Sequence, residues 1–214
     1  MIKLLHVLLL VYWLGADLGT YYASRFVADP ALPAAARGVA ARIMLGVDLA
    51  PRVTMPLMLA SGVHLAQSGG LLPGGGSALV AGTWALCLGW LAVVLAVHHL
   101  GAVRGSALVR FDFGWRLLLI AVLVGGSLGL ALPGFVALKL LAFAACVACG
   151  LMIRIHLRPF GPAFAKALHE GSDVQSCAEA NTTVARSIAR CKPYVLVIWA
   201  LLVLSAAAGL HLVP

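Results

Sequence analysis

The amino-acid sequence predicts an all-α fold, a polytopic membrane helical bundle of about six transmembrane helices with both termini outside. Of its residues, 63% are hydrophobic and only 10% are charged, whereas soluble domains are about 45–50% apolar. The apolar blocks are each about 20 residues long, the length that an α-helix needs to cross a hydrocarbon core. The basic residues flank these blocks mainly on one side, which is the topology signal of a membrane protein.

The six spans are expected, in chain order, at about 3–26, 38–66, 78–103, 114–132, 135–156 and 193–213. The first begins after Lys3 like a signal peptide, but aromatic residues occupy the place of a cleavage site, so we expect it to be retained. Pro51 and Pro56 are expected to kink the second span. Glycine and proline in SGGLLPGGGS and in Leu132-Pro133-Gly134 predict the turns that follow the second and fourth spans.

The only substantial polar stretch, 157–192, lies between the last two spans. Its mixed charges predict a cytoplasmic amphipathic helix, or a pair of helices, near the membrane surface. The whole chain, 1–214, is therefore expected to form a single transmembrane domain. It would consist of a three-span core at 1–105, spans four and five at 106–156, this amphipathic segment, and the last span at 193–214.

Orientation follows from the positions of the basic residues. Counted along the predicted spans, twelve of the fifteen fall on one side: Arg25, Arg37, Arg42, Arg104, Arg110, Arg116, Arg154, Arg158, Lys166, Arg186, Arg190 and Lys192. The positive-inside rule assigns this side to the cytoplasm. We therefore expect a multi-pass protein of the bacterial inner membrane with periplasmic N- and C-termini. The net charge of +8 is explained by topology and does not indicate a nucleic-acid partner.

Three ionisable residues, Asp17, Asp48 and Arg52, fall within the first two spans. Asp48 and Arg52 are four residues apart and can pair along one helix, and Asp17 lies at a similar depth. A charge at the bilayer centre costs at least about 2.5–3.5 kcal/mol on insertion scales, so such residues are expected to be partnered or functional. The cluster either locks two helices together or serves as a proton path or a site for a propionate or other anion.

The histidines lie near the ends of the spans. His6 and His64 are on adjacent antiparallel spans at the outer face, so their imidazoles could meet across the bundle. A haem held between two helices requires such a pair. His98 or His99 could form a second, inner site with His156. Copper is the alternative metal, although a Cu(I) site usually recruits sulfur ligands.

The pattern around His6 resembles a known family. HVLLLVYWLGADLGTYYASRF, in which Trp13 follows His6 by seven residues, resembles the first span of HemJ-type protoporphyrinogen oxidases and of related CopD-like membrane proteins. RIMLG before a proline-containing centre and His64 is similar to their second span, and GWLAVVLAVHHLG to their third. The resemblance covers about the first 105 residues and implies that His6 is a haem ligand. The lysine of the HemJ third span is absent from WLAVVLAVHH.

These observations predict a b-type haem protein of the inner membrane that transfers electrons or serves as the membrane subunit of an oxidoreductase. His6 and His64 are the expected iron ligands of haem b, and the other expected cofactor contacts are Arg52, Asp17, Asp48, His98, His99 and His156. The expected partners are the lipid bilayer, a redox protein or quinone, and further copies or subunits of a complex. The alternatives are a HemJ-like protoporphyrinogen oxidase, a CopD-like copper permease, and a cofactor-free membrane anchor.

Overall fold

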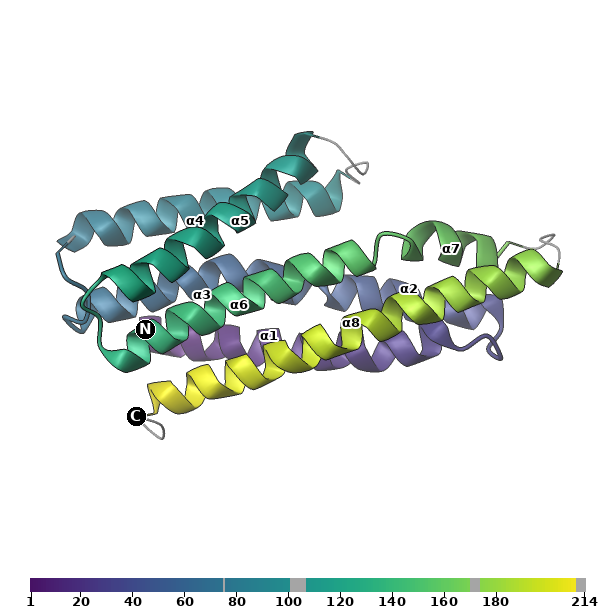
Figure 1. Ribbon diagram of the computed structural model, residues 1–214, viewed down its shortest axis with the longest axis horizontal. Coiled ribbons are helices and arrows are strands. Elements are labelled where there is room, and N and C mark those ends of the chain that lie inside the picture. The colour runs from purple at the N-terminus through teal and green to yellow at the C-terminus, as the bar shows by residue number, and fades with distance from the viewer. Residues whose placement is uncertain (75, 101–106, 170–173, 211–214) are drawn as a thin grey trace.

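The computed structural model describes residues 1–74, 76–100, 107–169 and 174–210, and all regular structure in these ranges is helical. The helices, labelled in Figure 1, are α1 (Ile2–Ala28), α2 (Ala34–Val47), α3 (Leu49–Ser68), α4 (Gly76–His99), α5 (Ala107–Gly129), α6 (Gly134–His156), α7 (Phe160–Ala167) and α8 (Val174–Gly209). The predicted all-α bundle is confirmed.

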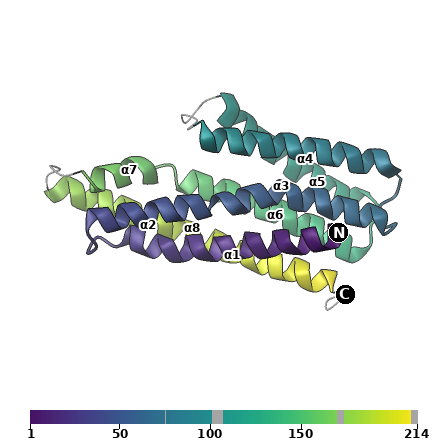
Figure 2. The same ribbon diagram turned by 180° about the vertical axis from the view of Figure 1, so that it is seen from behind.

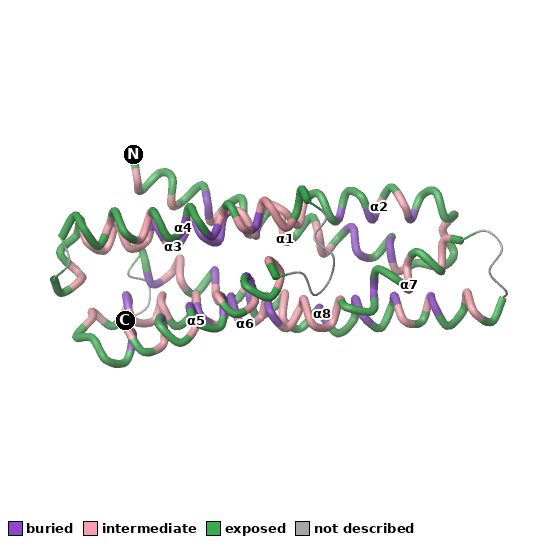
Figure 3. The backbone as a smooth tube through the Cα atoms, turned by 90° about the horizontal axis from the view of Figure 1, so that it is seen from above, coloured by how far each residue is buried: buried purple, intermediate pink, exposed green. Residues whose placement is uncertain are grey.

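Six long helices form a closed ring in which each contacts the next, in the order α1, α3, α4, α5, α6, α8 and back to α1. Viewed from above, α1 to α4 form one layer and α5 to α8 the other (Figure 3). All six contribute to one core: Leu9, Trp13, Met55, Met58, Trp90, Val94, Leu119, Leu123, Ala144, Cys146, Val147, Ile198 and Leu202. Many large apolar side chains outside this core are exposed, as expected of helices whose outer faces contact lipid.

Among the residues that the structure describes, five helical segments are long and apolar enough to cross a membrane: Ile2–Ala28, Ala34–Ser68, Gly76–His99, Gly134–His156 and Val174–Gly209. These correspond to five of the six predicted spans. The remaining one, α5, carries Arg110, Asp112 and Arg116 in its first half. It nevertheless occupies the place in the ring between α4 and α6. The apolar helices support a membrane protein.

The second predicted span, 38–66, consists of two helices, because α2 ends at Val47 and α3 begins at Leu49. Pro51 explains the break. Proline has no N–H to donate to the carbonyl of residue 47, and its ring clashes with that carbonyl. Pro56, which was also expected to disturb the span, lies inside α3 and is buried. The interruption leaves Asp48 between the two helices.

The last helix, α8, runs without interruption from Val174 to Gly209 and contains Pro193, so no helix end marks the boundary that was predicted at residue 193. Its 36 residues are about 54 Å long at 1.5 Å per residue, well beyond a hydrocarbon core of about 30 Å. The polar stretch therefore comprises α7 and the first half of α8, which pack together. With the end of α1 and with α2 they bury a second core: Ala23, Val27, Ala41, Met44, Phe160, Val184 and Ile188.

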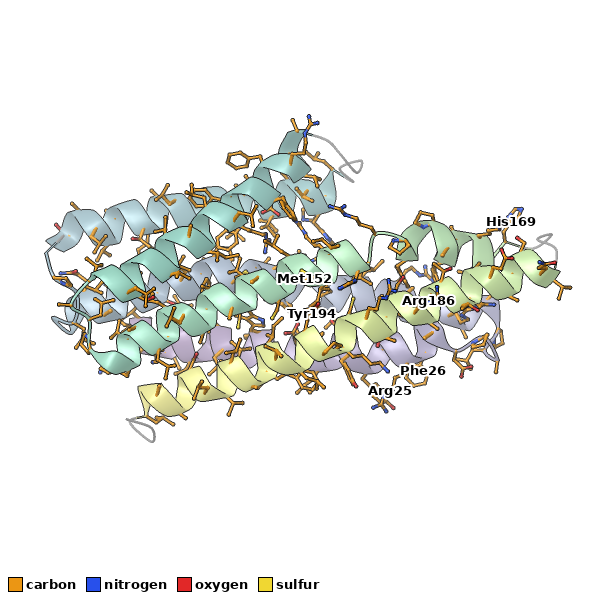
Figure 4. All side chains as sticks on the ribbon, viewed as in Figure 1. Arg25, Phe26, Met152, His169, Arg186 and Tyr194 are labelled. Atoms are coloured by element: carbon orange, nitrogen blue, oxygen red, sulfur yellow. The ribbon has the colours of Figure 1, made fainter. Side chains whose placement is uncertain are left out.

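Arg37 of α2 joins α7 and the first half of α8 to α1. Its Nε donates to the carbonyl oxygen of Val27 at 3.1 Å, and its Nη1 donates to Oδ1 of Asn181 at 2.9 Å. Its guanidinium lies 5.5 Å from the ring centroid of Phe164. One buried arginine thus ties α1, α2, α7 and α8 together. Arg25, His169 and Arg186 lie in the same half of the molecule (Figure 4), whereas the beginning of α1 and the end of α8 lie in the opposite half (Figures 1 and 2).

Candidate functional site

A cavity of about 170 Å³ lies between α1, the junction of α2 with α3, α5, α6 and α8. We call it the charged cavity because six charged side chains line it: Asp17, Asp48, Arg52, Arg116, Arg154 and Lys192. Its remaining walls are mainly apolar, and Thr20, Tyr21 and Ser24 add hydroxyl groups. The predicted cluster of Asp17, Asp48 and Arg52 is therefore brought to one place, together with three cations that the sequence interpretation did not include.

Asp48 and Arg52 form the ion pair that their spacing predicts. The side chains are 28% and 37% exposed, respectively, so the pair faces the cavity and is not sealed within the core. The junction of α2 with α3 positions it, because Asp48 lies between the two helices while Arg52 lies one turn into α3. Both side chains line the charged cavity.

A second ionic network lies beside the first and is centred on a fully buried carboxylate. Asp112 of α5 is 0% exposed and accepts three hydrogen bonds: from Trp90 Nε1 at 3.1 Å, from Arg116 Nε at 3.1 Å and from Arg154 Nη1 at 2.6 Å. The guanidinium of Arg116 also lies 5.2 Å from the Trp90 ring centroid. One carboxylate thus links α4, α5 and α6. The four-residue spacing of Asp112 and Arg116 could have indicated their pairing.

Asp17, unlike Asp112, does not accept hydrogen bonds from cationic side chains of neighbouring helices in the part of the chain that the structure describes. Its Oδ2 atom is buried and has no hydrogen-bond partner among the described residues, and the same holds for Oγ1 of Thr20, three residues further along α1. Both residues line the charged cavity. Buried polar atoms are nearly always satisfied by protein or water, so each exception requires an explanation. These two atoms therefore make the α1 side of the charged cavity the place where a further hydrogen-bond partner would bind.

His6 lies in the other half of the bundle, where its Nδ1 atom is 2.8 Å from Oγ of Ser61 in α3. Oγ of Ser61 also lies 3.1 Å from the carbonyl oxygen of Met58. A serine hydroxyl has one hydrogen, so Ser61 donates either to Met58, with His6 then donating from Nδ1, or to Nδ1 itself. In both arrangements the contact holds the His6 ring through Nδ1 and leaves Nε2 outside it, as in histidines that bind a metal through Nε2.

His64 contacts a different helix. Nε1 of Trp84 in α4 lies 3.4 Å from Nδ1 of His64, and an indole N–H can only donate. Nδ1 of His64 therefore accepts, and neutral His64 carries its proton on Nε2. The structure thus gives His6 and His64 different partner helices, α3 and α4.

The histidines that were predicted to form an inner site do not lie together. His98 and His99 are exposed at the end of α4, with their rings 5.0 Å apart in a T-shaped contact. His156 instead stacks on Tyr194 of α8, with 5.5 Å between the ring centroids. Within the described ranges, no three side chains of His, Cys, Asp or Glu are grouped closely enough to hold a metal ion. A haem iron needs only one or two protein ligands, so this finding bears on free metal ions alone.

Lys139 adds a cation near His6. The two residues are close enough to interact electrostatically, and a Cβ atom added at Gly209 would lie 2.5 Å from Nζ of Lys139. The ammonium group is therefore beside the C-terminal end of α8, where the carbonyl groups of a helix favour a cation.

Comparisons with known protein families, with curated proteins and with solved structures found no match in any of the three. The expected relationship to HemJ-type and CopD-like proteins therefore stays a prediction, which rests on the residues around His6, His64 and Trp90.

Proposed function

We propose that this protein is a b-type haem protein of the bacterial inner membrane that transfers electrons, alone or as the membrane subunit of an oxidoreductase. The observation that carries the proposal is the hydrogen-bond chain from His6 through Ser61 to Met58. It fixes the His6 ring through Nδ1 and leaves Nε2 outside this contact, which is how metal-bound histidines are usually held.

His6 fits the role of an axial ligand, whereas His64 does not fit it while Trp84 donates to its Nδ1. The proposal therefore assigns the iron to His6 and gives Lys139 the role of balancing a propionate, since a cation beside a carboxylate forms a strong, charge-assisted contact. Bound haem would supply reversible one-electron chemistry, and the redox partner would be a protein or a quinone.

The charged cavity lies outside this haem site. Asp17 follows His6 by eleven residues, or about 16 Å along a helix axis, which exceeds the reach of a propionate from its iron. Asp17, Asp48 and Arg52, which were expected to contact the cofactor, are therefore not part of the proposed site. Neither are the inner histidines His98, His99 and His156.

We also propose that α5 crosses the membrane, which gives six spans and places both termini in the periplasm. The ring order supports this, because α5 lies between α4 and α6. Its two buried ions, Asp112 and Arg116, neutralise each other, which reduces the cost of placing them in hydrocarbon.

The test is the reduced-minus-oxidised visible spectrum of the purified protein after expression with added haem precursor. We expect a b-type spectrum in the wild type, its loss in His6→Ala, and its retention in the matched variant His64→Ala. No haem band in the wild type would refute the proposal. Loss of the spectrum in His64→Ala with its retention in His6→Ala would identify His64, and not His6, as the iron ligand.

A further inference from the structure

The charged cavity contains more positive than negative charge. Arg52, Arg116, Arg154 and Lys192 line it, and three carboxylates oppose them: those of Asp17 and Asp48 in its wall and that of Asp112 behind it. Arg116 and Arg154 share Asp112. Arg116 is buried, whereas Arg154 is 29% exposed and Lys192 is exposed, so the excess positive charge is accessible to an anion from outside the core.

Arg154 and Lys192 are the cations best placed to receive that anion. Arg154 uses Nη1 for Asp112 but keeps 29% of its side chain exposed, so the rest of its guanidinium is available to the cavity. The Lys192 ammonium lies 6.0 Å from the ring centroid of Tyr21 and enters no ion pair within the described ranges. A guanidinium and an ammonium that face one space are a suitable binding pair for a carboxylate or phosphate.

The other surfaces of the cavity indicate what the anion is attached to. Apolar side chains from four elements line it, among them Met44, Met55, Ile153 and Ile198. On α1, Asp17 Oδ2 and Thr20 Oγ1 are unsatisfied, and both are suited to a water or hydroxyl group brought in with a ligand. Apolar walls with a few convergent polar groups are typical of small-molecule sites.

We propose that the charged cavity binds an amphiphilic oxyanion, an apolar chain that ends in a carboxylate or phosphate. Arg154 and Lys192 contact the acid group, and the chain lies against the apolar wall. This site is independent of the proposed haem site, since it uses none of His6, Ser61 or Lys139. The ligand enters either from the lipid as a fatty acid or lipid head group, or from water as a shorter acid.

Energy transfer from tryptophan to cis-parinarate, a fluorescent fatty acid, tests the proposal because Trp13 lines the cavity. The full-length protein in nanodiscs of zwitterionic phosphatidylcholine is titrated, and empty nanodiscs give the background. We expect saturable binding that Lys192→Met weakens roughly tenfold, as the loss of one charge-assisted contact does. The matched variant Lys3→Met, which removes an exposed lysine of α1 far from the cavity, should bind as the wild type does.

Asp17→Asn provides the decisive comparison. Removal of a negative charge beside an anion should tighten binding severalfold, while removal of the Lys192 charge weakens it. A generally damaged structure would not shift the affinity in opposite directions. Weaker binding in Asp17→Asn, or equal binding in all four proteins, would overturn the proposal.

Competitors separate the two sources of the ligand. Displacement of the probe by oleate but not by octanoate or inorganic phosphate would identify a lipid ligand, and displacement by octanoate or phosphate would identify a soluble one. Displacement by methyl oleate as effective as that by oleate would show an uncharged apolar groove and would contradict the role of the cations. None of these outcomes depends on whether the protein binds haem.

Discussion

Ser61 is the hydrogen-bond partner of His6. It is fully buried, and its Oγ lies 2.8 Å from Nδ1 of His6 and 3.1 Å from the carbonyl oxygen of Met58. Without this hydroxyl, the His6 ring loses an orienting contact.

We expect Ser61→Ala to lower haem affinity by about 10–100-fold, the usual effect of removing the hydrogen-bond partner of a metal-bound histidine. Ser61→Thr, which keeps the hydroxyl, is the matched control. Titration of haem into the purified apoprotein, followed at the Soret band, measures both. Equal haem affinity of Ser61→Ala and the wild type would show that Ser61 does not position His6 as an iron ligand.

Asp112 is the residue on which the ionic network of the ring depends. In Asp112→Asn, Arg116, which is 4% exposed, loses its counter-ion while it remains buried. Breaking one side of a buried ion pair costs about 3–5 kcal/mol. We expect a loss of this size in the free energy of unfolding, measured by titration with sodium dodecyl sulfate in mixed micelles.

The control for this variant is Asp29→Asn, because Asp29 is exposed and accepts one local hydrogen bond, from the N–H of Ala31. The free energy of unfolding of Asp29→Asn should fall by about 1 kcal/mol or less, as expected for the loss of a single hydrogen bond. Equal stability of the two variants would mean that the Asp112 network does not hold the ring together.

At the scale of helices, hydropathy predicted where the apolar segments lie, because it depends on neighbouring residues alone. It placed the beginning and end of α1 and α6 within about two residues, the usual uncertainty of helix ends. It did not predict the separation of α2 from α3 or the continuity of α8. Both depend on whether a proline is tolerated, which the surrounding helices decide: Pro51 accompanies a break, while Pro56 and Pro193 lie inside helices.

Pro51→Ala tests the cause of the break. Alanine restores the N–H that can bond to the carbonyl of Val47, so we expect α2 and α3 to join across Asp48. Amide hydrogen exchange, followed by mass spectrometry, should slow for a peptide that covers residues 47–52. The control, Pro56→Ala, lies within a formed helix and should leave exchange in that peptide unchanged. Exchange that is equally fast in the wild type and Pro51→Ala would show that another contact imposes the break.

At the scale of the molecule, closure of the ring brings together residues that sequence spacing cannot relate. Asp48 and Arg52 were predicted as a pair because they are one turn apart, and that pairing is confirmed. Arg154 meets Asp112 across 42 residues, and Lys192 reaches the cavity from the last helix. These contacts required the ring order, which composition and periodicity do not contain. For the same reason the approach of His64 to Trp84 was not predicted.

Six spans and five spans predict opposite locations for the C-terminus, so fusion proteins distinguish them. With six, alkaline phosphatase fused after Leu210 should be active in the periplasm, whereas a green fluorescent protein fused there should be dark. A fusion at Leu168, after α7, should give the reverse as the cytoplasmic control, because the basic residues lie on that side. A fluorescent C-terminal fusion would exclude α5 as a span.

We propose that two sites share one bundle, a haem site at His6 and a separate charged cavity. The most direct test is to titrate haem into the wild type, His6→Ala and Arg52→Gln in nanodiscs and compare their Kd values. We expect His6→Ala to lose specific binding while Arg52→Gln keeps the wild-type Kd. Haem binding that survives in His6→Ala and is lost in Arg52→Gln would instead place the cofactor in the cavity.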